Sequence, residues 1–239
     1  MEKRALVYEG KAKRVYETDD QNTVWIEYKD SATAFNGEKK AEISGKGRLN
    51  NEITSLLFTM LQEKGVRSHF IKRLSEKEQL VKRVTIIPLE VVVRNKVAGS
   101  LAKRLGLEEG TALATPIVEF FYKNDALGDP LITEDHIQVL QLAAKEEVAS
   151  LKEKALRVNG ELVRFFRDLG IQLIDFKVEF GKDSSGSILL ADEISPDTCR
   201  LWDIKTNEKL DKDVFRRNLG NLTETYEKLL ARLGGGQHV

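Results

Sequence analysis

Charged and apolar residues alternate along residues 173–181, and the charged ones are of types that bind phosphate groups and metal ions. A strand period of two places Asp175, Lys177 and Glu179 on one face. The other face carries only apolar side chains, namely Ile174, Phe176, Val178 and Phe180. The pattern therefore predicts a strand with a core face and a strongly ionic face. A solvated sheet face with alternating charges explains the pattern alone equally well.

A second acidic pair follows in the chain, at Asp192-Glu193. A hairpin through the turn at residues 183–186 would bring Asp192 close to Glu179. Adjacent carboxylates repel each other, so this arrangement requires a cation. Mg²⁺ prefers oxygen ligands and binds through one or two carboxylates together with water and phosphate oxygens. Neutralisation by Lys177, with a purely structural role, is the alternative.

A glycine turn with three nearby cations lies close to the N-terminus, in the sequence Gly10-Lys11-Ala12-Lys13-Arg14. The backbone NH groups and lysines of such a turn suit a lid over a polyphosphate. A lysine-rich hairpin is more often simply exposed. The sequence contains no Walker motif or dinucleotide-binding glycine pattern that would decide between the two.

Arginines near two predicted turns are candidates for binding a phosphate or carboxylate group. Arg94 ends an apolar strand, and a short helix follows near Ser100. Backbone NH groups, the Ser100 hydroxyl and the planar guanidinium would converge on an anion. Ordinary N-capping by Ser100, with Arg94 in solvent, is the alternative. The turn at residues 195–199 places Arg200 directly after the acidic strand.

Covalent catalysis has little support in the sequence. The one cysteine, Cys199, has no identifiable base, so we interpret it as a packing residue. His69, His136 and His238 are scattered, and they match no nucleophile motif or zinc-ligand spacing. We expect helix capping or exposure for His136 and a frayed tail around His238.

The composition excludes several classes of protein. The chain has 239 residues, enough for one large domain or two small ones, and is 41% hydrophobic and 32% charged, as in water-soluble globular proteins. Its 38 basic and 38 acidic residues create no overall field that would attract nucleic acid or a membrane. No apolar run approaches the roughly 18 residues of a membrane span, and the N-terminal segment lacks a signal-peptide core. With a single cysteine, these features predict a cytoplasmic protein.

Hydrophobic periodicity and turn residues predict the elements that position these side chains. Strands are predicted at residues 5–8, 12–17, 23–28, 79–87, 91–93, 117–122, 172–180 and 188–194. Helices are predicted at residues 49–64, 101–105, 133–144, 146–169 and 211–233. Residues 36–47 are predicted to be a polar loop, and Thr133 an N-cap without a complete capping box. Strands followed by helices and a hairpin, with no internal repeat, indicate a mixed α+β fold.

Several motifs resemble those of the SAICAR synthetase family, and the resemblance extends over nearly the whole chain. The two most specific segments are Ile86-Ile87-Pro88-Leu89-Glu90-Val91-Val92-Val93-Arg94 through Ala98-Gly99-Ser100, and Leu173-Ile174-Asp175-Phe176-Lys177-Val178-Glu179-Phe180-Gly181. Further matches in the family's order are Gly10-Lys11-Ala12-Lys13, Lys123-Asn124-Asp125, Asp192-Glu193-Ile194-Ser195-Pro196-Asp197 and Arg200-Leu201-Trp202-Asp203. Chance does not explain agreement at so many separated sites.

The resemblance implies a SAICAR synthetase-like α+β fold. A β-rich N-terminal lobe, residues 1–85, would face a larger mixed α/β C-terminal lobe, residues 86–239, across an ATP cleft, commonly in a homodimer. The activity implied is that of a ligase of purine biosynthesis with ATP and Mg²⁺ as cofactors. It would join L-aspartate to a carboxyaminoimidazole ribonucleotide through an acyl phosphate.

By the same resemblance, the candidate site residues fall into three groups. Those expected to bind the nucleotide are Gly10, Lys11, Ala12, Lys13, Lys82 and Lys123, with Glu179 and Asp192 holding Mg²⁺. Those expected to bind the imidazole ribonucleotide are Arg94, Ser100, Asp175, Arg200 and Lys212. Asp175 and Lys177 would act beside the reacting groups.

One segment departs from some family members, which carry an acidic residue where this chain has Ala34-Phe35-Asn36-Gly37. The residues that bind aspartate therefore stay unassigned. Two rival functions also stay open. A small-molecule kinase would release ADP without aspartate, and a nucleotide-binding module without catalysis would use the acidic strand only for structure.

Overall fold

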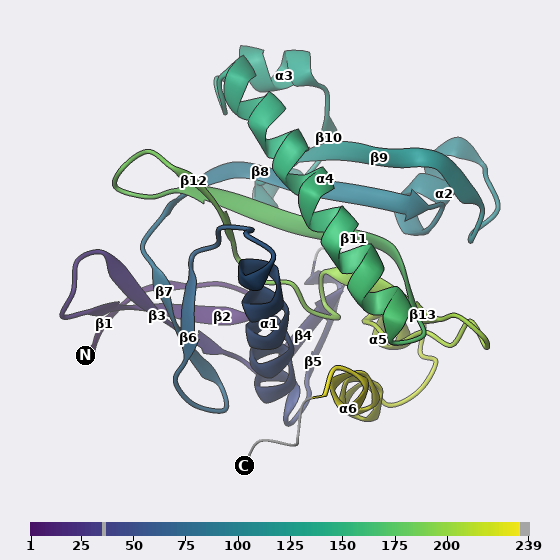
Figure 1. Cartoon of the computed structure of the whole chain (residues 1–239), viewed down its shortest axis with the longest axis horizontal. Coiled ribbons are helices and arrows are strands. Elements are labelled where there is room, and N and C mark those ends of the chain that lie inside the picture. The colour runs from purple at the N-terminus through teal and green to yellow at the C-terminus, as the bar shows by residue number, and fades with distance from the viewer. Residues whose placement is uncertain (35–36, 235–239) are drawn as a thin grey trace.

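The computed structural model describes residues 1–34 and 37–234, and it has two main antiparallel sheets with helices packed against them (Figure 1). This is the mixed α+β fold that the sequence predicts. Within the described ranges, no helix combines the length and the apolar character needed to cross a membrane.

The first sheet has five strands and contains the N-terminal meander. Its order is β1 (Lys3–Glu9), β2 (Lys13–Thr18), β3 (Thr23–Tyr28), β7 (Glu78–Lys82) and β6 (Phe70–Arg73). The first three strands lie where the sequence predicts them. Side chains of β3 and β7 form a small buried cluster of Val24, Ile26, Tyr28 and Val81. The turn at residues 10–12 connects β1, the edge strand, to β2.

A small hairpin and a long helix follow the meander. The hairpin pairs β4 (Ser31–Ala34) with β5 (Lys39–Glu42), so the predicted loop at residues 36–47 is wrong over β5. The polar side chains of β5 concealed this strand, which the backbone pairing with β4 defines. Helix α1 (Lys46–Glu63) then follows Gly45, whose φ of 83° a glycine adopts without strain. Its buried apolar positions recur every fourth residue, at Leu49, Ile53, Leu57 and Leu61.

The second sheet has six strands and is built around β11. Its members are β8 (Thr85–Lys96), β9 (Ala112–Tyr122), β10 (Leu131–Ile132), β11 (Ile171–Lys182), β12 (Ile188–Ala191) and β13 (Cys199–Asp203). Strand β11 pairs with β8 along one edge, and with both β13 and β12 along the other. The single strand predicted over residues 79–87 is wrong, because the chain leaves β7 in one sheet and enters β8 in the other.

The remaining helices are α2 (Gly99–Leu105), the 3₁₀ helix η2 (Asp125–Leu127), α3 (Glu134–Val139), α4 (Lys145–Asp168), α5 (Asp213–Arg216) and α6 (Leu222–Arg232). Helix α4 lies across one face of the second sheet (Figure 1) and buries an apolar stripe that includes Leu151, Leu162 and Phe166. At α3 the capping box is complete, contrary to the prediction. The Thr133 side chain accepts from the His136 NH, and Nδ1 of His136 accepts from the Thr133 NH.

The predicted helix over residues 211–233 is interrupted. It breaks into α5 and α6 around Asn218, which has a φ of 54°. Asn221 then caps α6, because its side chain accepts from the Glu224 NH. The sequence Asn218-Leu219-Gly220-Asn221 contains turn and capping residues, but the hydrophobic period on both sides masks them.

One hydrophobic core contains residues from both parts of the chain. It joins α1 residues such as Leu57 to Phe176 of β11 and Tyr226 of α6. The two main sheets are also linked by backbone bonds, because the His69 NH donates to the Leu190 carbonyl at 2.8 Å. The division at residues 1–85 and 86–239 follows the two sheets but not the core, and it stays a prediction.

Alternation along β11 follows the predicted pattern with one exception. Phe176, Val178 and Phe180 all join the main core. Ile174 is buried in a separate cluster with Ala98 and Trp202, since a β-bulge interrupts the alternation between Leu173 and Asp175.

Candidate active site

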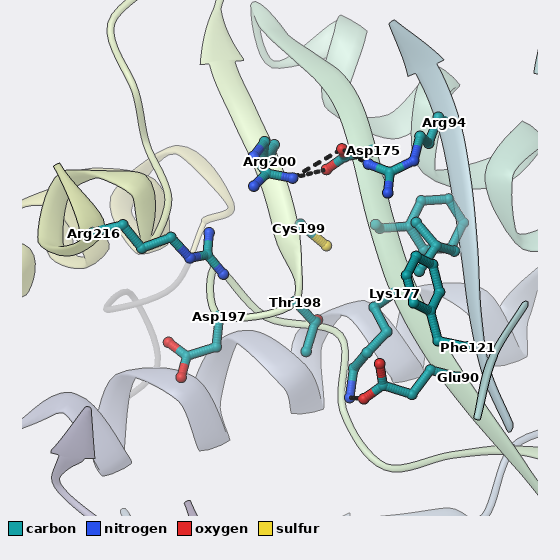
Figure 2. A pocket seen from close by; sticks show the side chains of 12 residues that line it. Glu90, Arg94, Phe121, Asp175, Lys177, Asp197, Thr198, Cys199, Arg200 and Arg216 are labelled. Atoms are coloured by element: carbon teal, nitrogen blue, oxygen red, sulfur yellow. Dashed lines mark hydrogen bonds and ion pairs between the residues drawn. The ribbon is translucent and has the colours of Figure 1, made fainter. Parts of the chain in front are cut away.

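A cavity of about 190 Å³ opens at the ionic face of β11. Its walls come from β8, β9, β11, the turn before β13, β13 itself, and α5. Figure 2 shows Arg94, Asp175 and Arg200 together at one end, and Lys177 with Glu90 at the other. The alternating residues of a single strand therefore connect two groups of charges.

The first group, which we call the arginine cluster, consists of Arg94, Glu119, Asp175 and Arg200. Arg94 donates to Asp175 at 2.8 Å and to Glu119 at 2.7 Å, and it is only 3% exposed. Arg200 donates to the same Asp175 carboxylate at 3.0 Å. Guanidinium groups bind anions through pairs of NH donors, so Arg94 and Arg200 at this end of the cavity suit an anionic group of a ligand.

The position of Ser100 excludes the capping alternative for this segment. Ala98 occupies the N-cap position of α2, and Ser100 lies within the helix. The Ser100 hydroxyl instead accepts from Arg94 at 3.1 Å and from Arg104 at 3.2 Å. Arg94 is buried rather than solvated. The structure thus brings together Arg94, Ser100, Asp175 and Arg200, and their role in binding the ribonucleotide stays a prediction.

The second group, which we call the lysine cluster, consists of Lys13, Lys123, Lys177, Glu179 and Asp192. The Lys177 ammonium lies 2.9 Å from Glu179 and 3.6 Å from Asp192. Lys123 contacts Glu179 at 2.7 Å, and Lys13 contacts Asp192 at 2.5 Å. The hairpin register explains the meeting of the two carboxylates, because Glu179 pairs with Ala191, the neighbour of Asp192.

Pairing within the lysine cluster favours the charged forms of Lys177 and Asp192. Burial alone would lower the pKa of Lys177, but the carboxylates of Glu179 and Asp192 raise it well above its usual value. Burial would raise the pKa of the Asp192 carboxyl, but Lys13 and Lys177 hold it well below its ordinary range. Asp192 also has a left-handed backbone, with a φ of 59°, a conformation that aspartate tolerates better than most residues.

The Gly10–Lys13 turn lies over these charges and connects the first sheet to the second. Gly10 donates its NH to the Lys13 carbonyl at 2.8 Å, which closes the turn around Lys11 and Ala12. The Lys11 ammonium reaches Asp125 of η2 at 2.7 Å. Two lysines of the turn thus contact carboxylates of the second part of the chain, so the turn is not simply an exposed hairpin.

The donor set of the lysine cluster fits a phosphate-bound Mg²⁺. Glu179 and Asp192 converge on one ammonium group and provide hard oxygen donors. Within residues 1–34 and 37–234 there is no group of three His, Cys, Asp or Glu residues able to hold a metal ion by itself. A magnesium ion that shares its ligands with phosphate and water needs only one or two protein carboxylates.

Two predicted residues lie apart from both clusters. Lys82 is exposed at the end of β7, and it interacts electrostatically with Asp183 in the β11–β12 turn. Lys212 does not line the cavity, but it contacts Asp197, which does, at 3.0 Å. Asn36 and His238 lie outside the described residues.

Cys199 lines the cavity, although the sequence suggests only a packing role. It is 2% exposed, and burial raises the pKa of its thiol. A thiol with a raised pKa is a poor nucleophile, so the geometry gives no support to covalent catalysis.

Sequence reasoning missed several charged residues at the cavity. Asp197 is held by Lys46 at 2.8 Å, by Lys212, and by the Tyr226 hydroxyl at 2.6 Å. Burial would raise the pKa of Asp197, but Lys46 and Lys212 hold it well below its usual range. The pair Gly45-Lys46 before a helix was an available signal for this site. No local pattern in the sequence indicates Arg216.

Comparisons with known proteins agree on one family. The SAICAR synthetase family model matches residues 6–233. A phosphoribosylaminoimidazole-succinocarboxamide synthase of Anoxybacillus flavithermus is 70% identical over 235 residues, which cover 98% of each chain. The crystal structure of the synthase of that name from Ehrlichia chaffeensis superposes with a TM-score of 0.94 at 48% identity, covering 97% of this chain and 99% of that one. A SAICAR synthetase in complex with ADP gives a TM-score of 0.92 at 50% identity, covering 95% and 96%.

Proposed function

Because the chain belongs to the SAICAR synthetase family, we propose that it is the ATP-dependent ligase that forms SAICAR in purine biosynthesis. Its substrates are ATP, L-aspartate and the carboxyaminoimidazole ribonucleotide. The observation that carries the proposal is the face of β11, where Asp175, Lys177 and Glu179 connect the arginine cluster to the lysine cluster. A phosphorylated substrate and a nucleotide can thereby lie end to end on one strand.

An amine cannot displace an oxide ion from a carboxylate, because oxide is a very poor leaving group. The carboxylate must therefore be activated before aspartate attacks it. The γ-phosphoryl group passes from ATP to a carboxylate oxygen of the ribonucleotide, which gives an acyl phosphate and ADP. The aspartate amine then attacks the carbonyl carbon, the carbon–oxygen bond to phosphate breaks, and phosphate leaves. Catalysis by the protein consists mainly of positioning the reactants and offsetting charge.

The lysine cluster and the glycine turn form the nucleotide end of the proposed site. Lys13 and Lys123 exchange their carboxylate partners for phosphate oxygens, with Lys11 and the backbone of Gly10 and Ala12 above them. Glu179 and Asp192 would hold Mg²⁺, which would offset the charge of the phosphate groups. Lys82 contacts the nucleotide outside the cluster.

The arginine cluster forms the ribonucleotide end. Arg94, Ser100 and Arg200 bind anionic groups of the substrate, and Lys212 approaches it beside Asp197. Lys177 lies at the boundary between the two ends, where the phosphoryl group is transferred. Asp175 orients the attacking amine or accepts its proton.

We further propose that the protein is a cytoplasmic homodimer that takes only small molecules as partners. Strand β1 supports self-association, because it is an edge strand and exposes Leu6, Val7 and Tyr8. A single buried cysteine is compatible with a reducing compartment. Light scattering of the purified protein should give the mass of two chains, and a monomer at micromolar concentration would contradict the dimer.

The deciding experiment measures ADP release by the purified protein with ATP, Mg²⁺ and the carboxyaminoimidazole ribonucleotide, with and without L-aspartate. Mass analysis of the product accompanies each reaction. We expect ADP release that depends on aspartate, together with a succinocarboxamide product. ADP release without aspartate, with a phosphorylated product, would indicate a small-molecule kinase. Nucleotide binding without turnover would indicate a non-catalytic module.

A further inference from the structure

Asp213, the first residue of α5, does not reach the cavity but contacts arginines that do. Its side chain is 1% exposed. One carboxylate oxygen accepts from Nε of Arg200 at 3.0 Å, and the other accepts from Nη1 of Arg216 at 2.7 Å. Arg200 and Arg216 both line the cavity and come from different elements, β13 and α5. A single buried carboxylate therefore connects two arginines of the candidate site.

The contacts of Arg200 show how its orientation is fixed. Asp213 holds its Nε, and Asp175 holds its Nη1 at 3.0 Å. With both ends held, the planar guanidinium keeps one orientation at the cavity wall. A free arginine side chain samples many rotamers, and a ligand would have to offset the loss of that freedom when it binds.

The position of Arg216 depends still more strongly on Asp213. It reaches the cavity from a four-residue helix, and its described ion pair is with Asp213. The positive charges of Arg200 and Arg216 would repel each other without the carboxylate between them. Figure 2 shows Arg216 approaching the cavity from the side opposite Arg94.

We propose that Asp213 is a positioning residue that presents Arg200 and Arg216 to the anionic groups of the imidazole ribonucleotide. The proposal rests on the ligase function proposed above and deepens it, since it assigns a role in binding one substrate to a residue that touches none. Asp213 lies away from the lysine cluster, so the nucleotide end of the site does not depend on it.

The test is the Asp213→Asn variant of the full chain, with Michaelis constants measured separately for the ribonucleotide, ATP and aspartate. We expect KM for the ribonucleotide to rise at least tenfold and KM for ATP to stay within twofold of wild type. Asparagine preserves the size of the side chain but removes the charge that holds both arginines.

Glu109→Gln is the matched control. Glu109 pairs with Arg217, the neighbour of Arg216, and neither Glu109 nor Arg217 lines the cavity. The control removes a carboxylate from the same group of arginines, so we expect all three Michaelis constants to stay within twofold of wild type. A tenfold rise in the ribonucleotide KM of the control would overturn the specific role of Asp213.

A second variant keeps the proposal testable if Asp213→Asn does not fold. Arg216→Gln changes a partly exposed side chain and should raise KM for the ribonucleotide at least tenfold. In a double variant, Asp213→Asn should add less than it does alone, because one of the two arginines that Asp213 positions is absent. Fully additive effects, or an equal rise in all Michaelis constants, would mean that Asp213 has only a structural role. Absence of ligase activity in the wild type would instead refute the proposed function.

Discussion

Asp175 illustrates how the role of one residue depends on its partners. It lies at the point where Arg94 and Arg200 meet, at 2.8 and 3.0 Å, and it is almost fully buried. Contacts from two arginines hold the carboxylate in one orientation. This geometry suits a residue that orients an amine rather than one that only neutralises charge.

Replacing Asp175 with Asn should reduce turnover about 100-fold or more, the usual range for a group that handles a proton in the transition state. Binding of ADP should stay unchanged, because Asp175 lies outside the lysine cluster. Steady-state rates and calorimetric ADP titration measure the two quantities. Asp203→Asn is the control, since Asp203 pairs with Arg232 at 2.7 Å away from the cavity. Near-normal turnover of the Asp175 variant would eliminate the assigned role.

At the scale of elements, the strands and their connections decide which charges meet. Strand β12 pairs with the end of β11 and β13 with its beginning, so the turn at residues 195–198 fits between them. The Lys177 NH donates to the Thr198 carbonyl in this turn at 2.8 Å. The connection therefore places Asp197 at the cavity and leads directly into β13, where Arg200 lies.

The beginning of α2 imposes a steric condition on the same arginine. Gly99 has a φ of 54°, and a Cβ at this position would lie 2.5 Å from a guanidinium nitrogen of Arg200. Because Arg200 is held by Asp175 and Asp213, it cannot move aside without breaking those contacts. Glycine at position 99 thus permits close approach of the helix to the arginine cluster.

Gly99→Ala should raise KM for the ribonucleotide at least tenfold through displacement of Arg200. Gly106→Ala is a matched control, with a similar φ of 64° but no atom within 4 Å of an added Cβ. Both variants should lose about 1–2 kcal/mol of unfolding free energy from backbone strain, and only the first should affect substrate binding. Urea denaturation and steady-state kinetics separate the two effects. Equal kinetic defects in both variants would refute the steric explanation.

At the scale of the whole molecule, contacts between the two parts of the chain hold the site together. The exposed Lys11–Asp125 pair, at 2.7 Å, connects the glycine turn to η2. Such surface pairs contribute about 0–1 kcal/mol to stability. The larger contribution comes from the core shared by α1, β11 and α6.

Variants of this pair distinguish a bridge from a phosphate contact. Lys11→Ala and Asp125→Asn remove the same ion pair, but only the first removes a cation that faces the proposed nucleotide. We expect Lys11→Ala to raise KM for ATP about tenfold, the effect of losing about 1.4 kcal/mol of binding free energy, and Asp125→Asn to leave it within twofold. Similar effects of both changes would show that closure between the sheets, rather than phosphate binding, is the role of Lys11.

The link between the two sheets also predicts how stability depends on pH. His69 lies at this link, is 3% exposed, and packs edge-on against Phe58. Burial lowers the pKa of His69 to about 3, chiefly through desolvation. The unfolded chain therefore binds more protons than the folded one between about pH 3 and 6.5, and stability falls as the pH decreases through this window.

His69→Phe should weaken this dependence. The histidine contributes a slope of up to about 1.4 kcal/mol per pH unit to the unfolding free energy of the wild type, and phenylalanine contributes none. Urea denaturation at several values between pH 4.5 and 7 measures the slopes of both proteins. Parallel slopes would show that His69 is not buried in its neutral form.

The local features of this protein could be predicted from its sequence. Three examples are the alternation in β11, the helical period of α1 and α4, and the acidic hairpin. Each is a pattern among neighbouring residues, so it can be predicted without knowledge of the fold. The motifs around Arg94 and Asp175 also pointed to the family and to most of the residues now found in two clusters. The predicted secondary structure was wrong where backbone pairing or a turn overrode the side-chain pattern, as in β5 and at Asn218.

Which distant charges meet, and which of them pair, depends on the folded chain and could not be predicted from local sequence. Lys46, Asp197 and Tyr226 come from separate parts of the chain, and nothing in their local sequence predicts one buried ion-pair group. The contact of Asp213 with both Arg200 and Arg216 likewise depends on how α5 packs against β13. The physical reason is that the energy of a charge depends on its burial and on the partners within a few ångströms, and the folded chain sets both.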